Sequence, residues 1–395
     1  MKILYISNFY VLRNSSAAIR NNAFVKGLVE LGHQVDVLTV RQSDTSISKN
    51  LSYGNIIYTD LFNLSLRKAI KGKVVGNGRL KDFLGNGYMK LQKILHFPDA
   101  YYKWPDKVDV NQLGNYDLLV TSSDGKISHF VGYKIKTARP HLKWVQIWGD
   151  PWLEDVNSTF YDKIRIRKYE KRFLEAADQV VYISRPTADA MKEKYPSLSN
   201  KISFVPRSYL NSFEYEVPHD GNFHITYTGA LFAVHGRNID NLVSIINEYN
   251  DHNDKKIFLD VYGVVDEEIK KGLKGGCVNY HDSIDVSMLP EVYKHSNALL
   301  YLSNKEGSTQ IPGKLYDYIG TSSLVLCLVN NYEDGIAQFI KSIGDHCVLV
   351  KNTKEELCHK MSQILMKMEE SYKPDVSFSP LSVAEEFVAL VSKSE

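Results

Sequence analysis

The sequence predicts an α/β protein of two Rossmann-like domains that face each other across a cleft, with a C-terminal helix that returns to the first domain. Short apolar runs alternate with helical patterns, and this alternation stops at the polar stretch Ser208–Asn222 and then starts again. The length of 395 residues is sufficient for two cores. We place the first domain at residues 1–207, the second at 208–380 and the closing helix at 381–395.

The apolar runs of the first domain predict six parallel strands. Several of them are apolar nearly throughout, as expected of strands that helices cover on both faces. Between the first two runs, Phe24, Leu28 and Leu31 fall at helical spacing, and Gly32 provides a stop before the next strand. The six predicted strands are Lys2–Ser7, Gln34–Val40, Asp117–Thr121, Lys143–Ile147, Gln179–Ser184 and Lys201–Val205.

The pattern restarts in the second domain with five further strands and ends in a helix from about Ser382 to Val391. Ligands of such α/β proteins bind beyond the carboxyl ends of the parallel strands, so we expect the site there. The predicted strands are His224–Thr228, Ile257–Tyr262, Ala298–Ser303, Leu324–Val329 and Cys347–Val350.

The composition excludes several classes of protein. A net charge of +2 argues against a nucleic-acid-binding protein, which usually carries a strongly basic domain. No apolar run approaches the ~18 residues that span a bilayer, and Met1–Tyr10 resembles a first strand more than a signal peptide. We therefore expect a cytoplasmic protein that is soluble or attached to the inner face of the cell membrane.

A basic segment in the first domain has two interpretations. Residues 64–81 carry six Lys or Arg residues and no acidic residue, interleaved with apolar side chains, and Lys90 and Lys93 follow. The segment 64–93 could therefore be an amphipathic element that contacts an anionic membrane. The alternative is a solvated insertion.

The strongest motif runs from Glu306-Gly307 through Pro312 to Lys314 and Asp317, directly before a predicted strand. Pro312 suits the first turn of a helix, and the free N–H groups of a helix start form a site for a diphosphate. Lys314 would add a point charge, and Asp317 could accept hydrogen bonds from ribose hydroxyls. The simpler alternative is an ordinary amphipathic helix after a glycine-containing loop.

This segment resembles the nucleotide-sugar glycosyltransferases of GT-B architecture, especially the retaining glycosyltransferase family 4. Members of that family typically carry an E-G…P-x-K-L-x-E-Y segment before a strand, and here Glu306, Gly307 and Lys314 match, with Asp317 in place of the second acidic residue. The resemblance implies that Glu306 holds sugar hydroxyls and that Asp317 contacts the ribose.

The start of the second domain fits the same resemblance. Gly229 follows the first strand of that domain and would let the backbone approach the donor. Arg237 follows eight residues later and could clamp a phosphate. A surface salt bridge is the alternative for Arg237.

In the first domain, Trp144–Ile147 runs into Trp148-Gly149-Asp150-Pro151-Trp152. This stretch is similar to the W-x-x-x-x-R-D-P-W pattern of a bacterial subgroup, with Gly149 in place of the Arg. Asp150 is our catalytic candidate on the acceptor side, and the two tryptophans could form a wall on which a sugar stacks. A cap of the following helix is the alternative role for Asp150.

Two further positions of the first domain are candidates for ligand contact. Ser16 lies in a loop of small residues, Asn14–Ala18, that would permit close approach of a sugar or phosphate. His129 could face the cleft or pack within a helix.

The resemblance implies transfer of a sugar from a UDP- or GDP-linked donor to a hydroxyl of a glycan or lipid-linked acceptor, with retention, in bacterial surface polysaccharide synthesis. Arg237, Lys314 and the helix start would stabilise the leaving diphosphate. No Asp-x-Asp triplet, Walker A pattern or zinc-type cluster occurs, so we expect no metal and no cofactor. A non-catalytic partner subunit and a sugar-nucleotide 2-epimerase are the alternatives.

Overall fold

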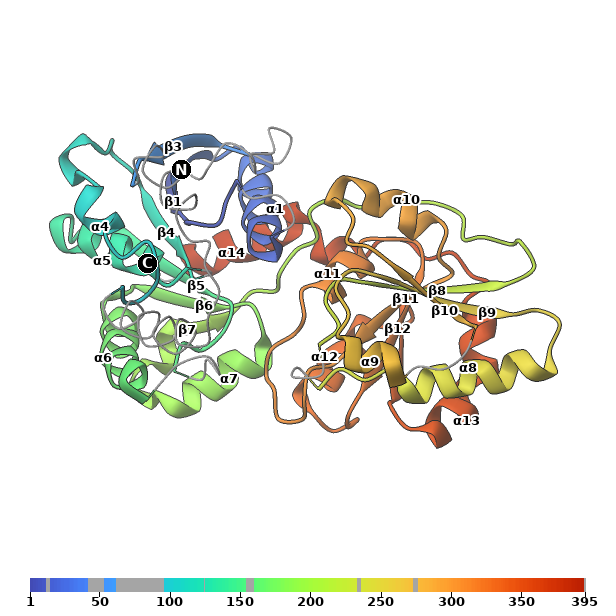
Figure 1. Ribbon diagram of the computed structural model, residues 1–395. Coiled ribbons are helices and arrows are strands. Elements are labelled where there is room, and N and C mark those ends of the chain that lie inside the picture. Colours follow the sequence, from blue (N-terminus) through green and yellow to red (C-terminus); the bar gives the residue numbers. More distant parts are fainter. Residues whose placement is uncertain are drawn as a thin grey trace, which may run out of the picture. The chain divides into compact units, whose positions relative to one another are not determined.

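The computed structural model describes residues 1–11, 15–41, 53–61, 96–123, 125–153, 160–232, 236–272 and 276–393 (Figure 1). The chain divides into two compact units. The first comprises Met1–Ile183, Thr187–Val205 and Ala384–Glu395, and the second comprises Ser184–Pro186 and Pro206–Val383. The basic segment 64–93 and Asn14 lie outside the described residues.

Within the described residues, the first unit contains a parallel sheet of seven strands in the order β3-β2-β1-β4-β5-β6-β7. The strands are β1 (Lys2–Ile6), β2 (Gln34–Val40), β3 (Asn55–Thr59), β4 (Leu118–Ser122), β5 (Lys143–Trp148), β6 (Gln179–Tyr182) and β7 (Ile202–Phe204). The helices are α1 (Ser16–Glu30), α4 (Trp104–Lys107), α5 (Ile127–Ala138), α6 (Phe160–Ala176), α7 (Arg185–Lys194) and the C-terminal α14 (Pro380–Ser392), of which Arg185, Pro186 and Pro380–Val383 are grouped with the second unit.

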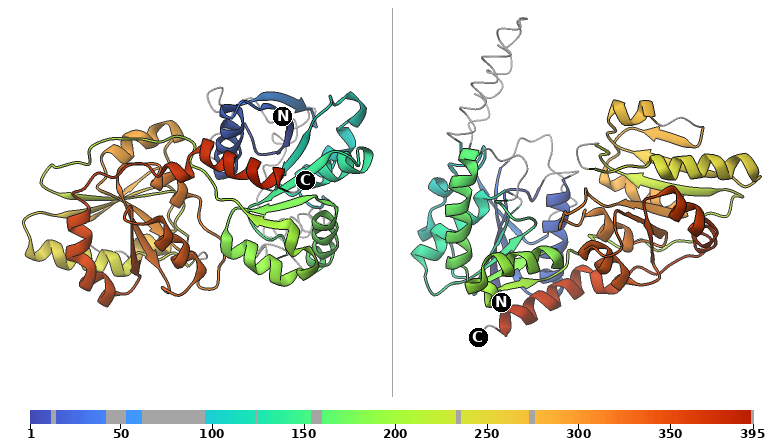
Figure 2. Two further views of the ribbon diagram at one scale, coloured as in Figure 1. Left: turned by 180° about the vertical axis from the view of Figure 1, so that it is seen from behind. Right: turned by 90° about the horizontal axis from the view of Figure 1, so that it is seen from below.

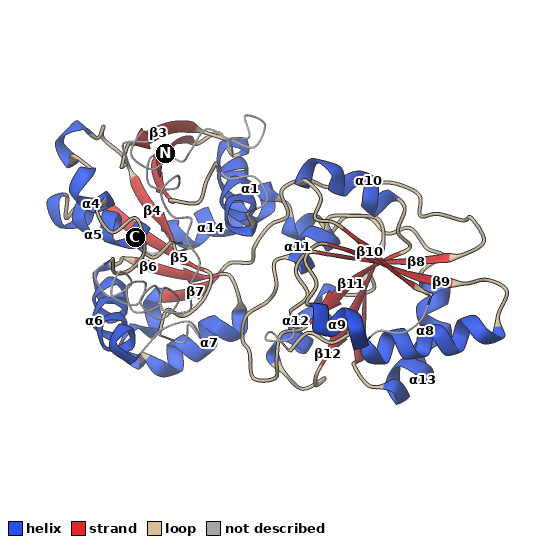
Figure 3. Cartoon of the chain, in the orientation of Figure 1, coloured by secondary structure: helices blue, strands red, loops and turns tan. Residues whose placement is uncertain are grey.

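The described part of the second unit contains a parallel sheet of six strands in the order β10-β9-β8-β11-β12-β13. Figure 3 shows helices on both faces of this sheet. The strands are β8 (Phe223–Thr228), β9 (Ile257–Tyr262), β10 (Val278–His281), β11 (Ala298–Leu302), β12 (Leu324–Val329) and β13 (Cys347–Lys351). The helices are α8 (Asp240–His252), α9 (Glu267–Gly272), α10 (Leu289–Lys294), α11 (Lys314–Ile319), α12 (Gly335–Ile343) and α13 (Lys354–Lys367).

The predicted class of two parallel-sheet Rossmann-like domains is confirmed. The apolar run Leu324–Val329 is buried at every residue because helices cover both faces of β12. Two edge strands, Asn55–Thr59 and Val278–His281, were not predicted. Both mix polar with apolar residues and are only partly buried, so their sequences lack the continuous apolar signal.

The C-terminal helix α14 packs within the first unit from Ala384 onward, as the view from behind shows (Figure 2). The ring of Phe387 meets that of Phe24 on α1 edge-on, with 4.9 Å between the ring centroids. The ammonium of Lys143 at the start of β5 donates to the carbonyl of Val391 at 2.5 Å. These contacts join the end of the chain to the first sheet.

Gly132 on α5 tests how tightly the first core is packed. A Cβ built on Gly132 would overlap the methyl group of Thr121 and would lie 2.9 Å from the indole nitrogen of Trp144, and both neighbours are fully buried. Overpacking of this kind costs about 1–3 kcal/mol, and the better helix propensity of Ala returns at most about 1 kcal/mol. We expect Gly132→Ala to lower the free energy of unfolding of the first unit.

Urea denaturation followed by tryptophan fluorescence would measure this change, since Trp144 lies in the affected core. The matched control is Gly114→Ala, because a Cβ at position 114 would make an ordinary 3.4 Å contact with the ammonium of Lys2. If Gly132→Ala were as stable as the control, the core around Thr121 would be less tightly packed than we describe.

Candidate anion site at the carboxyl edge of the second sheet

Two glycines bring the chain together where β8 and β9 end. Gly229 and Gly263 directly follow these strands and have φ values of 118° and 137°, a region that favours glycine. The Gly229 N–H donates to the Tyr262 carbonyl at 2.6 Å. A Cβ on Gly263 would overlap the carbonyl of Gly229, so both positions need glycine for this close approach.

Lys314 is the first residue of α11, and its ammonium lies against Gly229. A Cβ on Gly229 would overlap the Nζ and Cε atoms of Lys314. The ammonium also lies over the ring of Tyr227, 5.1 Å from the centroid. Within the described residues, Nζ forms no hydrogen bond or ion pair. The structure thus brings together Gly229 and Lys314, which the sequence analysis predicted to share a site.

The surroundings of Lys314 lower the pKa of its ammonium to about 8. Burial is the largest cause, and the nearby guanidinium of Arg237 adds to it. The carboxylate of Asp317 raises the pKa, and Arg207 lowers it again by a smaller amount. Burial disfavours the charged form of this lysine, and an anion bound beside the ammonium would stabilise that form.

Arg237 is held by neutral groups at the same edge of the sheet. Its Nη1 atom donates to the carbonyl of Ala230 at 3.1 Å and to the hydroxyl of Tyr227 at 3.3 Å, and Nη2 donates to the side-chain oxygen of Asn304 at 3.0 Å. The buried Nε atom has no hydrogen-bond partner in the described part of the chain. The surface salt bridge considered for Arg237 is not observed among the described residues.

Asp317 is already engaged by an arginine that the sequence analysis did not identify. The Nη2 atom of Arg207, whose side chain is 3% exposed, lies 3.1 and 3.2 Å from the two carboxylate oxygens of Asp317. The two residues are 110 positions apart. No local pattern could therefore have paired them, although Arg207 lies two residues after the last predicted strand of the first domain.

The three cations outnumber the carboxylate in this cluster. Lys314, Arg237 and Arg207 carry up to three positive charges against the single negative charge of Asp317, which leaves +2 when Lys314 is protonated. Buried charges are normally paired, so an excess of this kind, next to two glycine turns, is suited to bind a dianion. We call these four residues the cation cluster.

Helix α11 starts later than the sequence predicted. Its first residue is Lys314, with Gly313 at the cap position, so Pro312 precedes the helix and does not lie in its first turn. Tyr318 faces the core, and its hydroxyl accepts a hydrogen bond from the Thr228 N–H at 3.0 Å. Helix α11 therefore holds the end of β8 through the Tyr318 hydroxyl, and its first residue, Lys314, contacts Gly229 just after that strand.

Glu306 and Gly307 lie in the loop before α11. Gly307 has a φ of 79°, and Ser184 holds the loop by donating from its hydroxyl to the carbonyl of Thr309 at 2.6 Å. Glu306 is exposed and forms no hydrogen bond or ion pair with a described residue. The structure thus brings neither residue into a hydrogen bond or ion pair with the cation cluster.

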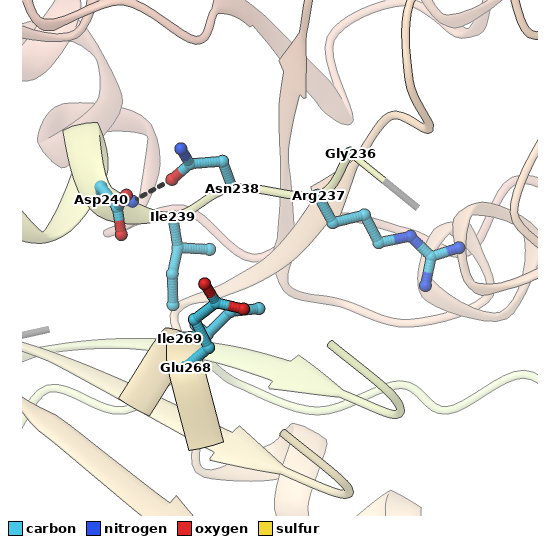
Figure 4. Close-up of a pocket in the computed structure, with 7 residues that line it drawn as sticks. All are labelled: Gly236, Arg237, Asn238, Ile239, Asp240, Glu268 and Ile269. Carbon is cyan, nitrogen blue, oxygen red and sulfur yellow. Dashed lines mark hydrogen bonds between the residues drawn. The ribbon is translucent and has the colours of Figure 1, made fainter. Parts of the chain in front are cut away.

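A cavity of about 360 Å³ opens beside the loop that carries Arg237 (Figure 4). Asp240 and Glu268 contribute carboxylates to its lining, and Figure 4 shows the Arg237 side chain pointing away from both. Two carboxylates disfavour a phosphate. The cavity is therefore a neighbour of the cation cluster and not the anion site itself.

In the first unit, Asp150 is exposed at the carboxyl end of β5, as expected for a ligand-binding group. The capping role considered for it stays a prediction, because residues 154–159, which precede the described start of α6 at Phe160, lie outside the described residues. The two tryptophans around it do not form a sugar-stacking wall. Trp148 is 0% exposed and Trp152 is 4% exposed, and the latter stacks on Phe97 at 5.4 Å.

Ser16 is exposed in the first turn of α1, where the neighbouring Ser15 caps the helix by accepting from the Ala18 N–H. His129 is fully buried, with its Nδ1 atom 2.7 Å from the Thr121 hydroxyl, so the helix-packing interpretation is the correct one. Burial is the largest cause that lowers the pKa of His129, which keeps the ring neutral.

Gly149, which replaces the arginine of the subgroup pattern, faces another arginine. A Cβ at position 149 would lie 2.7 Å from the Nη1 atom of Arg20, which α1 supplies and whose Nη2 atom donates to Ser122 at 3.2 Å. The guanidinium of Arg20 thus lies next to Gly149, the residue before Asp150. The sequence analysis missed Arg20 because α1 and β5 are far apart in the sequence.

No group of three or more His, Cys, Asp or Glu side chains among the described residues could hold a metal ion. None of the helices that the structure describes is long and apolar enough to cross a membrane.

The sequence matches no protein-family model and no curated protein. Solved structures resemble its fold over nearly the whole chain. The apo form of the lipopolysaccharide outer core galactosyltransferase WaaB has a TM-score of 0.58 and 14% identity, with 100% of both chains covered. A trehalose-6-phosphate synthase, OtsA, has a TM-score of 0.60 and 11% identity, with 100% of this chain and 99% of the other covered.

A structure assigned as a UDP-N-acetylglucosamine 2-epimerase, from Listeria monocytogenes, has a TM-score of 0.53 and 12% identity, with 99% of this chain and 96% of the other covered. At such identities the similarity shows the fold alone. The chain therefore has the GT-B type of fold, with two parallel-sheet Rossmann-like domains.

Proposed function

We propose that this protein is a glycosyltransferase that moves a sugar from a UDP- or GDP-linked donor to a hydroxyl of a glycan or lipid-linked acceptor. The cation cluster of the second unit is the observation that carries the proposal. A nucleoside diphosphate would supply the negative charge that Lys314 and Arg237 lack among the described residues. The WaaB-like fold supports transfer as the reaction, and retention and a role in surface polysaccharide synthesis follow from the sequence resemblance.

The chemistry requires stabilisation of the leaving diphosphate while the bond between the anomeric carbon and its oxygen breaks. Negative charge grows on that oxygen in the transition state, and fixed cations aimed at it lower the barrier. Lys314 and Arg237 are placed for this role because both lie at the Gly229 turn. The glycine leaves the space that a phosphate needs beside the backbone.

Arg207 and Asp317 act on the site together. Arg207 holds the Asp317 carboxylate, and this pair limits how far Asp317 can compensate the charge of Lys314. Asp317 retains 27% side-chain exposure, which leaves an oxygen lone pair available to a ribose hydroxyl. We assign Arg207 as a positioning residue that fixes the proposed ribose contact.

On the acceptor side, we assign Asp150 of the first unit to the acceptor hydroxyl. Ser16 remains assigned to contact with the sugar or phosphate of the donor. Glu306 and Gly307 remain assigned to the sugar of the donor through the resemblance. A 2-epimerase is the second candidate, because one structure of similar fold is assigned that activity. A subunit without catalytic activity is the third.

Incubation with a panel of sugar nucleotides distinguishes the three candidates. We expect slow release of free nucleoside diphosphate and sugar, since water can replace the acceptor in a transferase. A changed sugar that is still attached to an intact diphosphate would identify an epimerase instead, and no reaction would favour the non-catalytic subunit.

Asp150→Asn should bind the donor normally and lose turnover by about a hundredfold; equal turnover would remove Asp150 from the catalytic assignment.

The affinity for a nucleoside diphosphate should depend on pH through Lys314. The pKa of about 8 applies to the free protein, and a bound anion raises it. Above pH 8, binding therefore takes up a proton, and the association constant should fall as pH rises through about 8. Between about pH 6, near the pKa of the terminal phosphate, and about pH 7, the association constant should be constant. Titration calorimetry across this range would show it.

Lys314→Arg provides the matched control, because a guanidinium stays charged over the whole range. The variant should bind with an association constant that no longer falls near pH 8. A wild-type affinity that is constant from pH 7 to 10 would contradict the placement of Lys314 on the diphosphate.

A further inference from the structure

Helix α6 of the first unit exposes apolar side chains at its start. Phe160, Tyr161 and Ile164 are 75%, 69% and 58% exposed, respectively. Their spacing places them on one side of the helix, and the rings of Phe160 and Tyr161 meet edge-on at 6.1 Å. Burial of these side chains would remove apolar surface from water, so this cluster is suited to a partner surface.

Cations continue the same exposed side. Lys163, Arg167 and Lys168 are exposed and form no ion pair with a described residue. Lys171 lies 3.7 Å from Glu175, an exposed pair that is worth little in water. We call this combination of three apolar and four basic side chains on α6 the basic-apolar face.

Of the acidic residues of α6, Glu175 is paired with Lys171. Glu170 is fully buried and accepts hydrogen bonds from the N–H groups of Trp152 and Leu153 at 2.8 and 3.0 Å. Asp162 has an interaction partner of its own and is half-buried. Lys163, Arg167 and Lys168 therefore remain without an ion-pair partner among the described residues.

The first half of α6 lies beside the chain that leaves β5. The guanidinium of Arg165 lies 4.6 Å from the ring centroid of Phe97, and that ring stacks on Trp152 at 5.4 Å. Trp152 follows Asp150 by two residues. The basic-apolar face thus belongs to the same end of the first sheet as our acceptor-side candidate.

We propose that the basic-apolar face of α6 docks on an anionic phospholipid surface. Cations attract anionic headgroups, and apolar side chains at the same helix end enter the boundary between headgroups and acyl chains. The site is separate from the basic segment 64–93 and does not depend on the proposed activity.

The charges on this face disfavour a second copy of the chain as its occupant. A two-fold interface brings the same patch of both copies together, which would place Lys163, Arg167 and Lys168 opposite an equal set. Like charges in contact are repulsive across an interface. An anionic phospholipid surface has negatively charged headgroups directly above apolar acyl chains, so it can bind both the cations and the apolar side chains of this face.

Vesicle flotation with the full chain tests the proposal. We expect binding to vesicles that contain phosphatidylglycerol and little binding to pure phosphatidylcholine. In the variant Lys163→Gln/Arg167→Gln/Lys168→Gln, each lost cation should lower the partition coefficient on the order of fivefold at low salt. Phe160→Ser/Tyr161→Ser/Ile164→Ser should lower binding at low and at high salt, because apolar insertion is not screened.

Matched controls are available on the second unit. Lys294→Gln/Lys341→Gln/Lys373→Gln removes three exposed cations, and Met288→Ser/Met366→Ser/Val376→Ser removes three exposed apolar side chains. Both controls should float like the wild type, and circular dichroism should show that all four variants are folded.

Equal flotation of the wild type and both α6 variants would overturn the proposal. So would a concentration-dependent dimer in analytical ultracentrifugation that the apolar α6 variant abolishes while vesicle binding is unchanged, because the face would then be an interface between copies. A third contradicting result would be nucleic acid that displaces the wild type from vesicles and binds the apolar α6 variant as tightly as the wild type. This result would overturn the proposal too, because the face would then be a nucleic-acid site formed by its cations alone.

Discussion

The contact between the Lys314 ammonium and the backbone of Gly229 determines the arrangement of the second unit's functional edge. A side chain at position 229 would displace the lysine ammonium and would strain the backbone, whose φ is 118°. The carbonyl of the same glycine lies where a side chain at position 263 would begin, so two strand ends and one helix start converge on one point. The lysine is thereby desolvated, and its pKa falls to about 8. An anion at this point is the natural source of the missing charge compensation.

The strand pattern could be predicted well from the sequence because buried parallel strands are continuous apolar runs. The strand Gln34–Val40 and the strand Leu324–Val329 have the bounds that their sequences predict. The edge strand Val278–His281 could not be found in this way, since two of its four residues are exposed. Residue type also misled us at Trp148, where an aromatic side chain at a strand end proved to be core.

The site was harder to predict than the fold, because its contacts join residues far apart in the chain. Lys314 and Gly229 were found by motif, and the structure brings them into contact. Arg207 was missed, and its ion pair with Asp317 shows that the carboxylate has a protein partner as well as its proposed ribose contact. The N-terminal loop residue Asn14 and the basic segment 64–93 lie outside the described residues, so the predictions made for them remain predictions.

The central claim is that the cation cluster binds the diphosphate of a sugar nucleotide, and the most direct measurement is the affinity for UDP and GDP by titration calorimetry. A charge-assisted hydrogen bond is worth about 1.5–3 kcal/mol, so Arg237→Ala and Lys314→Ala should each weaken binding roughly ten- to hundredfold. Lys294→Ala, which removes an exposed cation of the same unit, should bind as the wild type does. Unchanged affinity in both cluster variants, or a wild-type protein that binds neither nucleotide, would contradict the account.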